Sequence, residues 1–305
     1  MTHYKWFETF TLIAAISPTL LAETHCPGNV ASVPLRNVNR YQMIVQVTAN
    51  HSGPYEFLLD TGTQATIIDP SLAAELHLSS VGLVTVAGVG FHEPASLVRL
   101  DTLAVGHHSV SDQTILVSDL SRMKAVGLNI QGILGQDFLE NFDILIDNSH
   151  RMLCLDDAHA MRSGLKGTRV PLLPTQTPGS TPTVKSLVLN IHFVRGKGTV
   201  RLMLDSGANT PFLYKPSVCL EIGVIEGASW HGRGANGEQQ GFVALPPQDL
   251  TINGMEMPQV QFLALRNARK EPTNYSLPYD GLLPTGLFSR VFLSQSGEFA
   301  VLEPK

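Results

Sequence analysis

One short motif occurs twice in this sequence, and the repeat limits the folds that the chain can adopt. In residues 57–62 and again in residues 202–207, three apolar residues lead to an Asp, a small hydroxyl residue and a Gly. A second apolar run follows each Gly within a few positions. An Asp that ends a buried strand before a turn is a carboxylate held at a fixed place on a loop. Two such loops in one chain predict a pair of carboxylates, Asp60 and Asp205.

The surroundings of the motif repeat as well, which matters because Asp-Thr-Gly alone also marks ordinary turns. Residues 132–135 read Gly-Ile-Leu-Gly, and residues 281–284 read Gly-Leu-Leu-Pro. They end 75 and 79 positions after their respective Asp. We therefore interpret the chain as a duplication of one unit of about 135 residues.

Composition fits two folded units. The chain has 305 residues, 43% of them hydrophobic and 15% charged, which is typical of globular domains with cores of their own. The net charge is −5 and no run of Lys or Arg is present. These features argue against nucleic acid as a partner.

The pattern of apolar residues predicts an all-β fold. Alternation over residues 41–47 and 186–191 predicts a strand ahead of each Asp strand. A Thr-, Pro- and Gly-rich segment, 174–182, is expected to be a surface loop, close to a boundary between the units at about residues 160–168. Closing hairpins are predicted to turn at 147–150 and 294–297, and short helices are predicted at 70–78, 136–141, 216–222 and 285–290.

The N-terminal residues look like a targeting segment. Lys5 precedes an apolar stretch, residues 10–22, which is too short to span a bilayer and ends in small residues. This predicts a signal peptide over residues 1–22 and export to the periplasm or out of the cell. Glu8 and Leu20 fit that pattern imperfectly, so an uncleaved membrane anchor is the alternative.

The chain has three cysteines, Cys26, Cys154 and Cys219. They are too few for a disulfide scaffold and have no metal-ligand spacing. Cys154 and Cys219 lie in apolar patterns and are predicted to be core residues. An exported chain could form one disulfide, but the sequence does not select the pair.

Together these motifs resemble the aspartic peptidases of the retropepsin and pepsin clan, over residues 30–304, and bacterial exported proteins with retropepsin-like repeats in particular. The resemblance implies a bilobal acid-protease fold with an active-site cleft between two duplicated retropepsin-like β-barrel lobes. We place the lobes at residues 30–160 and 165–305. The sequence departs from the family at Pro284, where the family has a second Gly, and at Ala208, which lacks the hydroxyl of Thr63.

The chemistry of the two carboxylates agrees with this resemblance. Two carboxylates within hydrogen-bonding distance share one proton and can activate a water between them, with no metal or cofactor. Asp60 and Asp205 are therefore the expected catalytic residues of an aspartic endopeptidase, monomeric because one chain supplies both. The resemblance implies that the hydroxyls of Thr61 and Ser206 join the two loops and that the Thr63 hydroxyl donates to Asp60. The residues expected to support the pair are Thr61, Gly62, Thr63, Ser206, Gly207 and Ala208.

Each unit also has a Gly-rich segment about 28 positions after its Asp. We interpret these segments as flaps that close over a peptide or protein substrate in extended conformation, which would pair as an added strand. Ordinary Gly-rich turns are the alternative. The candidate flap residues are Gly88, Val89 and Gly90 in the first unit and Gly232, Arg233 and Gly234 in the second.

Other classes of site fit less well. The eleven histidines show no zinc-binding spacing, and the Gly-x-Gly-x-x-Gly match at residues 232–237 lacks the βαβ unit of a dinucleotide site. The strongest alternative is a catalytically inactive relative that uses the same two-lobed fold to bind peptide or to scaffold a partner.

Overall fold

The computed structural model describes residues 26–88, 91–124, 126–173, 187–194, 199–213, 229–233, 239–265 and 278–305. The predicted signal peptide, the predicted loop at 174–182, the predicted helix at 216–222 and Cys219 lie outside these ranges. No helix within the described ranges is long and apolar enough to cross a membrane.

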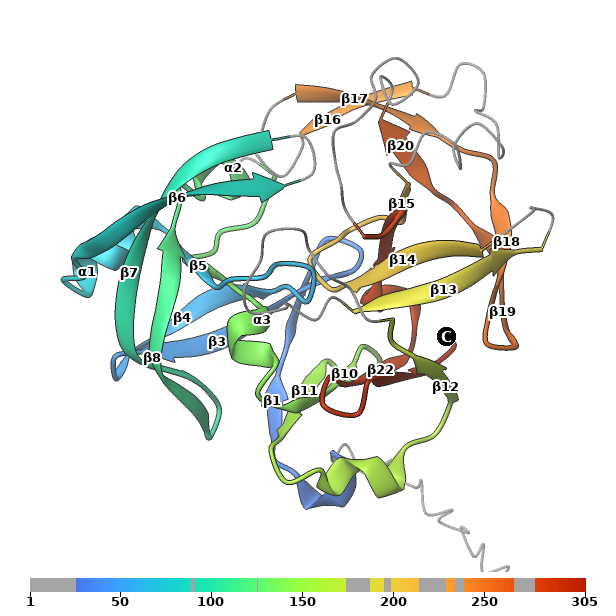
Figure 1. Ribbon diagram of the computed structural model, residues 1–305, viewed down its shortest axis with the longest axis horizontal. Helices are drawn as coiled ribbons and strands as arrows, with labels where there is room; N and C mark the ends of the chain where they lie inside the picture. The colour runs from blue at the N-terminus through green and yellow to red at the C-terminus, as the bar shows by residue number, and fades with distance from the viewer. Residues whose placement is uncertain are drawn as a thin grey trace, which may run out of the picture.

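The fold consists of β-sheets joined by short helices, so the predicted all-β class is confirmed (Figure 1). The helix expected from residue 70 ends at Glu75, and the one expected over 285–290 is a single 3-10 turn, because Phe288 already has extended backbone before the next strand. The helices are α1 (Pro70–Glu75), α2 (Ser121–Lys124) and α3 (Gln136–Leu139), and the 3-10 turns are η1 (Pro27–Asn29), η2 (Ala160–Gly164) and η3 (Thr285–Leu287).

The first half of the chain forms an eight-stranded sheet, drawn in blue to green in Figure 1. A further pairing between β3 and β7 curls this sheet back on itself. In spatial order its strands are β2 (Arg36–Val38), β3 (Gln42–Ala49), β4 (Ser52–Leu59), β9 (Gly132–Leu134), β5 (Ile67–Ile68), β8 (His108–Val117), β7 (Phe91–Val105) and β6 (Ser80–Gly88).

The second half forms a nine-stranded sheet with the same central arrangement. In both sheets the strand that leads to the Asp pairs in parallel with a later strand, which also pairs antiparallel with the strand after the Asp loop. In spatial order its strands are β16 (Ser229–Arg233), β17 (Gln239–Ala244), β20 (Leu263–Leu265), β15 (Phe212–Leu213), β21 (Gly281–Pro284), β14 (Thr199–Asp205), β13 (Val188–Phe193), β18 (Gln248–Ile252) and β19 (Met255–Val260).

A third sheet of six strands draws equally on both halves and lies below the other two in Figure 1. The two predicted closing hairpins form its centre, where β10 pairs with β22. This sheet joins the halves of the chain, and the lobe boundaries given above stay a prediction. In spatial order its strands are β1 (Ser32–Pro34), β11 (Met152–Asp156), β10 (Asp143–Asp147), β22 (Arg290–Ser294), β23 (Phe299–Glu303) and β12 (Thr168–Pro171).

The apolar core explains why the Asp strands are fixed. β4 runs from an exposed start to a fully buried end, and Phe57 and Leu59 are among its buried side chains. Leu202 and Leu204 are buried in the same way on β14. Burying one such side chain contributes about 1.5–3 kcal/mol, so these strand ends are the least mobile backbone on which a carboxylate could be placed.

A disulfide joins Cys26 to Cys154 on β11. The sequence had left the choice of pair open, and its expectation that Cys154 is a core residue holds, since the disulfide packs within a small apolar cluster that includes Leu145, Met161 and Phe292. The two cysteines are 128 positions apart. Closing a loop of that length restricts the unfolded chain and contributes about 2–5 kcal/mol of stability.

A buried ion pair holds the chain at the predicted boundary. Arg162 in η2 binds Asp143 on β10 through Nε at 2.5 Å and Nη2 at 3.1 Å, and it also donates to Ser294 and Ser296 at the β22–β23 turn. Burial alone would raise the pKa of Asp143, but hydrogen bonds from Arg162, Ser294 and His159 outweigh it and hold the pKa below its usual value. The ionised form is therefore stabilised by folding.

We expect Arg162→Met to lower the free energy of unfolding at pH 7 by about 3 kcal/mol, because it leaves a carboxylate buried without its partner. The difference from the unchanged protein should shrink as the pH falls from about 4, the ordinary pKa of an Asp in the unfolded chain, through the lowered pKa of Asp143, because a protonated Asp143 no longer needs the cation. Urea unfolding at pH 7 and pH 3 measures both effects. Arg36→Met, which removes an exposed ion pair with Glu56, is the matched control and should cost less than about 1 kcal/mol. Equal losses in the two variants would contradict this account.

Candidate active site

The two Asp residues occupy equivalent places in the two large sheets. Asp60 directly follows β4, and Asp205 is the last residue of β14. The Asp60 N–H donates to the carbonyl of Leu134 at 3.1 Å, and Asp205 pairs with Pro284 in the parallel register. Each carboxylate thus stands at the end of a central strand, where neighbouring strands fix its backbone.

Two hydroxyl groups join the Asp loops across the halves of the chain. The Thr61 hydroxyl donates to the Leu204 carbonyl at 2.9 Å and accepts from the Ser206 N–H at 3.0 Å. The Ser206 hydroxyl donates to the Leu59 carbonyl at 2.7 Å and accepts from the Thr61 N–H at 3.0 Å. Both side chains are fully buried, so each bond is made where water cannot replace it. This is the connection that the resemblance implied for these residues.

The glycines of the two loops lie against the opposite carboxylates. A Cβ atom on Gly62 would lie 2.6 Å from Cγ of Asp205, and one on Gly207 would lie 2.6 Å from Oδ1 of Asp60. Real Cβ contacts are not that short, so any larger residue would displace the carboxyl group. Only glycine therefore allows the two carboxyl groups to approach each other this closely.

Backbone amides hold each carboxylate in the same way. Gly62 and Thr63 donate to Oδ1 of Asp60 at 2.8 and 3.1 Å. Gly207 and Ala208 donate to Oδ1 of Asp205 at 2.7 and 3.0 Å. The loss of a hydroxyl at Ala208 thus removes no contact of this kind.

The hydrogen bond expected from the Thr63 hydroxyl to Asp60 is not formed between these two described residues. Thr63 contacts the carboxylate through its backbone N–H instead, and Ala208 does the same on the other side. The prediction was wrong because a turn of this shape points successive amides at the Asp, which needs no particular side chain at the third position.

The carboxyl groups of Asp60 and Asp205 are hydrogen-bonded to each other and share a buried environment. Burial raises the pKa of Asp60 against the opposing effect of the amides of Gly62 and Thr63. Burial raises the pKa of Asp205 well above its usual value, and the negative charge of Asp60 raises it further. Asp205 is also the more buried, with 7% of its surface exposed. Both pKa values are thus raised, that of Asp205 more strongly, and the two carboxyl groups titrate as one pair.

Two buried glutamines that the sequence analysis did not single out hold the backbone carbonyls of these loops. Gln136 in α3 donates to the Thr61 carbonyl at 2.6 Å, and Gln42 on β3 donates to the Gly207 carbonyl from the other half of the chain. Gln295 in turn donates to the Gln136 side chain. The sequence does show polar residues at the start of an otherwise buried strand and helix, which could have drawn attention to these glutamines. It cannot show that they bind the loops, because a backbone carbonyl partner leaves no pattern in the sequence.

Pro284, where the sequence departs from the family, is matched by a second proline, Pro211, in the same half of the chain. In the first half, the Gly135 N–H donates to the Thr66 hydroxyl at 3.1 Å. The strand registers place Pro284 and Pro211 at the corresponding positions. The donor and the acceptor of this hydrogen bond have both been replaced by proline, so Pro284 leaves no hydroxyl unpaired at that place.

The predicted flaps lie on antiparallel hairpins. Gly88 ends β6 and pairs with Phe91 at the start of β7, while Gly232 and Arg233 belong to β16 and pair with β17. Both hairpins lie on the side of the molecule away from the six-stranded sheet (Figure 1). The predicted tip residues Val89, Gly90 and Gly234 lie outside the described ranges.

The described residues contain no group of three or more His, Cys, Asp or Glu side chains that could hold a metal ion.

Comparison with known proteins supports the resemblance. Residues 45–138, which include Asp60, β9 and most of α3, match the family model of aspartyl proteases. A solved structure of a retropepsin-like aspartic protease from Rickettsia conorii is similar over 42% of this chain and 92% of that chain, with 16% identity and a TM-score of 0.32. No curated protein matches the chain. The match to the family model confirms the predicted resemblance to aspartyl proteases over residues 45–138.

We expect Thr61→Val to lower the free energy of unfolding by about 2–4 kcal/mol. The change keeps the shape of the side chain but leaves the Leu204 carbonyl and the Ser206 N–H buried without a partner, at about 1–3 kcal/mol each. Thr63→Val is the control, since that hydroxyl joins nothing across the two halves, and should change stability by less than about 0.5 kcal/mol. Chemical denaturation followed by fluorescence measures both. If the two variants were equally stable, the exchange of hydrogen bonds would not be holding the loops.

Proposed function

We propose that this protein is an aspartic endopeptidase that hydrolyses peptide bonds with a water molecule activated by Asp60 and Asp205. The observation that carries the proposal is the pairing of two largely buried carboxyl groups by equivalent loops, with the pKa of both groups raised. Placing two carboxyl groups of like charge together inside a protein is energetically costly. Pairs of this kind with perturbed pKa values are therefore typical of sites where the shared proton takes part in a reaction.

The proposed reaction uses each carboxyl group in one role. Ionised Asp60 takes a proton from the water, whose oxygen attacks the scissile carbonyl carbon. Protonated Asp205 gives its proton to the carbonyl oxygen, which becomes a hydroxyl in the tetrahedral intermediate. The C–N bond then breaks, the leaving nitrogen takes a proton from Asp60, and Asp205 recovers the proton from the hydroxyl. The products are a carboxylic acid and an amine, and the pair returns to its starting state.

The proposed substrate is a peptide or protein in extended conformation. β6 and β16 each end the spatial order of their sheet, so each has an edge with no further described strand beside it. A substrate could add to such an edge through its main chain, which gives affinity without dependence on sequence. This placement supports the interpretation of the two hairpins as flaps.

We also propose that the protein is exported and acts as a monomer. The Cys26–Cys154 disulfide supports export, because disulfides persist in oxidising compartments and are rare in the cytosol. The monomer is supported by the presence of both carboxyl groups and both joining hydroxyls in one chain. A second subunit would add nothing that the proposed reaction requires.

We expect Asp60→Asn and Asp205→Asn each to lower kcat/KM by roughly 10³-fold or more, because either change removes the shared proton but keeps the shape of the side chain. The double variant should be no worse than either single one, since the two residues act as a unit. The measurement is cleavage of an unfolded protein with and without a statine-type inhibitor, with thermal unfolding to verify the fold. Asp112→Asn, at an exposed ion pair far along β8, is the control and should keep full activity. Binding of the unfolded protein without cleavage would favour an inactive peptide-binding relative.

The rate should depend on pH through the pair as a whole. Activity should fall in acid as Asp60 becomes protonated, and it should fall again above the raised pKa of Asp205, where both groups are ionised. Thr63→Ala and Ala208→Thr should leave both limbs of the profile in place, because only the backbone amides of these residues reach the carboxylates. A shift of either limb by more than roughly half a pH unit would show that the side chain at that position contacts the pair.

A further inference from the structure

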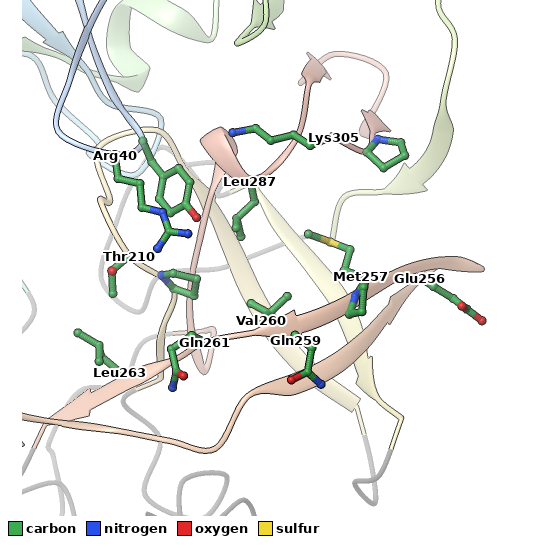
Figure 2. Close-up of a pocket in the computed structure, with 14 residues that line it drawn as sticks. Arg40, Thr210, Glu256, Met257, Gln259, Val260, Gln261, Leu263, Leu287 and Lys305 are labelled. Carbon is green, nitrogen blue, oxygen red and sulfur yellow. The ribbon is translucent and has the colours of Figure 1, made fainter. Parts of the chain in front are cut away.

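A cavity of about 350 Å³ lies beside the second sheet, against the turn that precedes β3 (Figure 2). Its walls include neither Asp60 nor Asp205, nor any of the predicted flap residues. The residues that line it come from both halves of the chain and are Arg40, Tyr41, Thr210, Pro211, Glu256, Met257, Pro258, Gln259, Val260, Gln261, Leu263, Leu287, Pro304 and Lys305.

The second half has smaller residues beside this cavity than the first half has at the corresponding chain positions. The strand registers place Pro211 where the first half has Thr66, and counting on from the last paired positions aligns Gly286 and Leu287 with Asp137 and Phe138. In the first half, Phe138 is fully buried, and the Thr66 hydroxyl donates to Asp137 at 2.6 Å. The second half has neither the ring nor this hydrogen bond.

Tyr41 takes up part of this space and brings a polar group to it. A Cβ atom on Gly286 would lie 2.8 Å from Cβ of Tyr41, so the base of the tyrosine is packed against that glycine. Tyr41 is only 8% exposed, and it lines the cavity. Its hydroxyl forms no hydrogen bond with any residue in the described ranges. The hydroxyl is the accessible part of this side chain, and without a partner in the described part of the protein it has a donor to offer to a ligand.

Two cations stand at the same end of the cavity. The guanidinium carbon of Arg40 lies 4.9 Å from the centre of the Tyr41 ring, and Nζ of Lys305 lies 5.5 Å from it. Neither forms an ion pair with an acidic residue in the part of the chain that the structure describes. Figure 2 shows the charged ends of Arg40 and Lys305 on one side, whereas Glu256 is at the opposite end and points away from the cavity.

Apolar side chains line the centre of the cavity, although the wall as a whole is mixed. Met257, Val260 and Leu287 lie around its centre in Figure 2. The two glutamine amides in the wall are already used, since Gln259 donates to Asp249 and Gln261 to the Leu245 carbonyl. An open pocket of this size, with apolar side chains at its centre and polar groups around them, can take a small molecule.

We propose that this cavity binds a small organic carboxylate with a compact apolar body. The carboxylate would accept the hydrogen bond of the Tyr41 hydroxyl and lie beside Arg40 and Lys305, and the body would fill the space between Val260 and Leu287. Charge-assisted hydrogen bonds of this kind are strong in a partly buried site. The same chemistry is found in free aliphatic acids and at the C-terminus of a peptide that ends in an apolar residue. The proposal does not depend on peptidase activity.

The test is calorimetric titration of the full chain with sodium octanoate and with N-acetyl-leucine, which represent the two sources. Octanamide and N-acetyl-leucinamide are the uncharged counterparts of these probes. We expect saturable binding of at least one acid and at least roughly tenfold weaker binding of its amide. The acid that binds more tightly identifies the source.

The variants test which groups hold the carboxylate. Tyr41→Phe keeps the ring and its packing, and should weaken the acid roughly tenfold while leaving the amide unchanged. Arg40→Met should weaken the acid and reduce the dependence of its affinity on salt. Lys166→Met, which removes an exposed cation outside the cavity, is the control and should bind like the unchanged protein. Equal affinity for acid and amide, no binding of either acid, or equal binding by Tyr41→Phe and Lys166→Met would each overturn the proposal.

Discussion

The exchange of hydrogen bonds between Thr61 and Ser206 is the contact on which the rest of the site depends. Each hydroxyl donates to a carbonyl in the other half of the chain and accepts from the amide of the other hydroxyl residue. Hydrogen bonds that are fully buried on both sides cannot be exchanged for bonds to water, so separation of the two loops would break four hydrogen bonds and leave two carbonyls, two amides and two hydroxyls unpaired at once. The fold therefore fixes the distance between the two Asp strands. The glycine after each hydroxyl residue has no side chain, which allows the two carboxyl groups to approach each other at that distance.

Bringing two carboxyl groups together is electrostatically unfavourable, and the structure shows how the cost is limited. Oδ1 of each group accepts two backbone amides, and one proton stays on the pair because its more buried member, Asp205, has a strongly raised pKa. Stability elsewhere in the molecule offsets what remains. The apolar strand ends, the disulfide between Cys26 and Cys154, and the ion pair of Asp143 with Arg162 hold the elements around the site without touching it.

The two halves of the chain keep the same strand order around the Asp loops but differ beside them. In the second half, Pro284 and Pro211 replace a hydrogen-bonded Gly and Thr, and Gly286 and Leu287 replace Asp137 and Phe138. Neither change touches the carboxyl groups, so the loops could be retained while the neighbouring packing diverged. The cavity at Tyr41 lies beside these smaller side chains.

The sequence by itself determined the features that depend on local patterns: the all-β class, the repeat, and the placement of Asp60 and Asp205 each after a buried strand. Alternating apolar residues and a Gly-permitted turn are enough for such inferences, because they follow from the period of a strand and the freedom of one backbone position. The sequence missed the supporting role of Gln42 and Gln136 and misplaced that of Thr63, because all three act on or through backbone groups. It also left open which cysteines pair. That was decided only by the tertiary structure, since it depends on the distance between residues far apart in the chain.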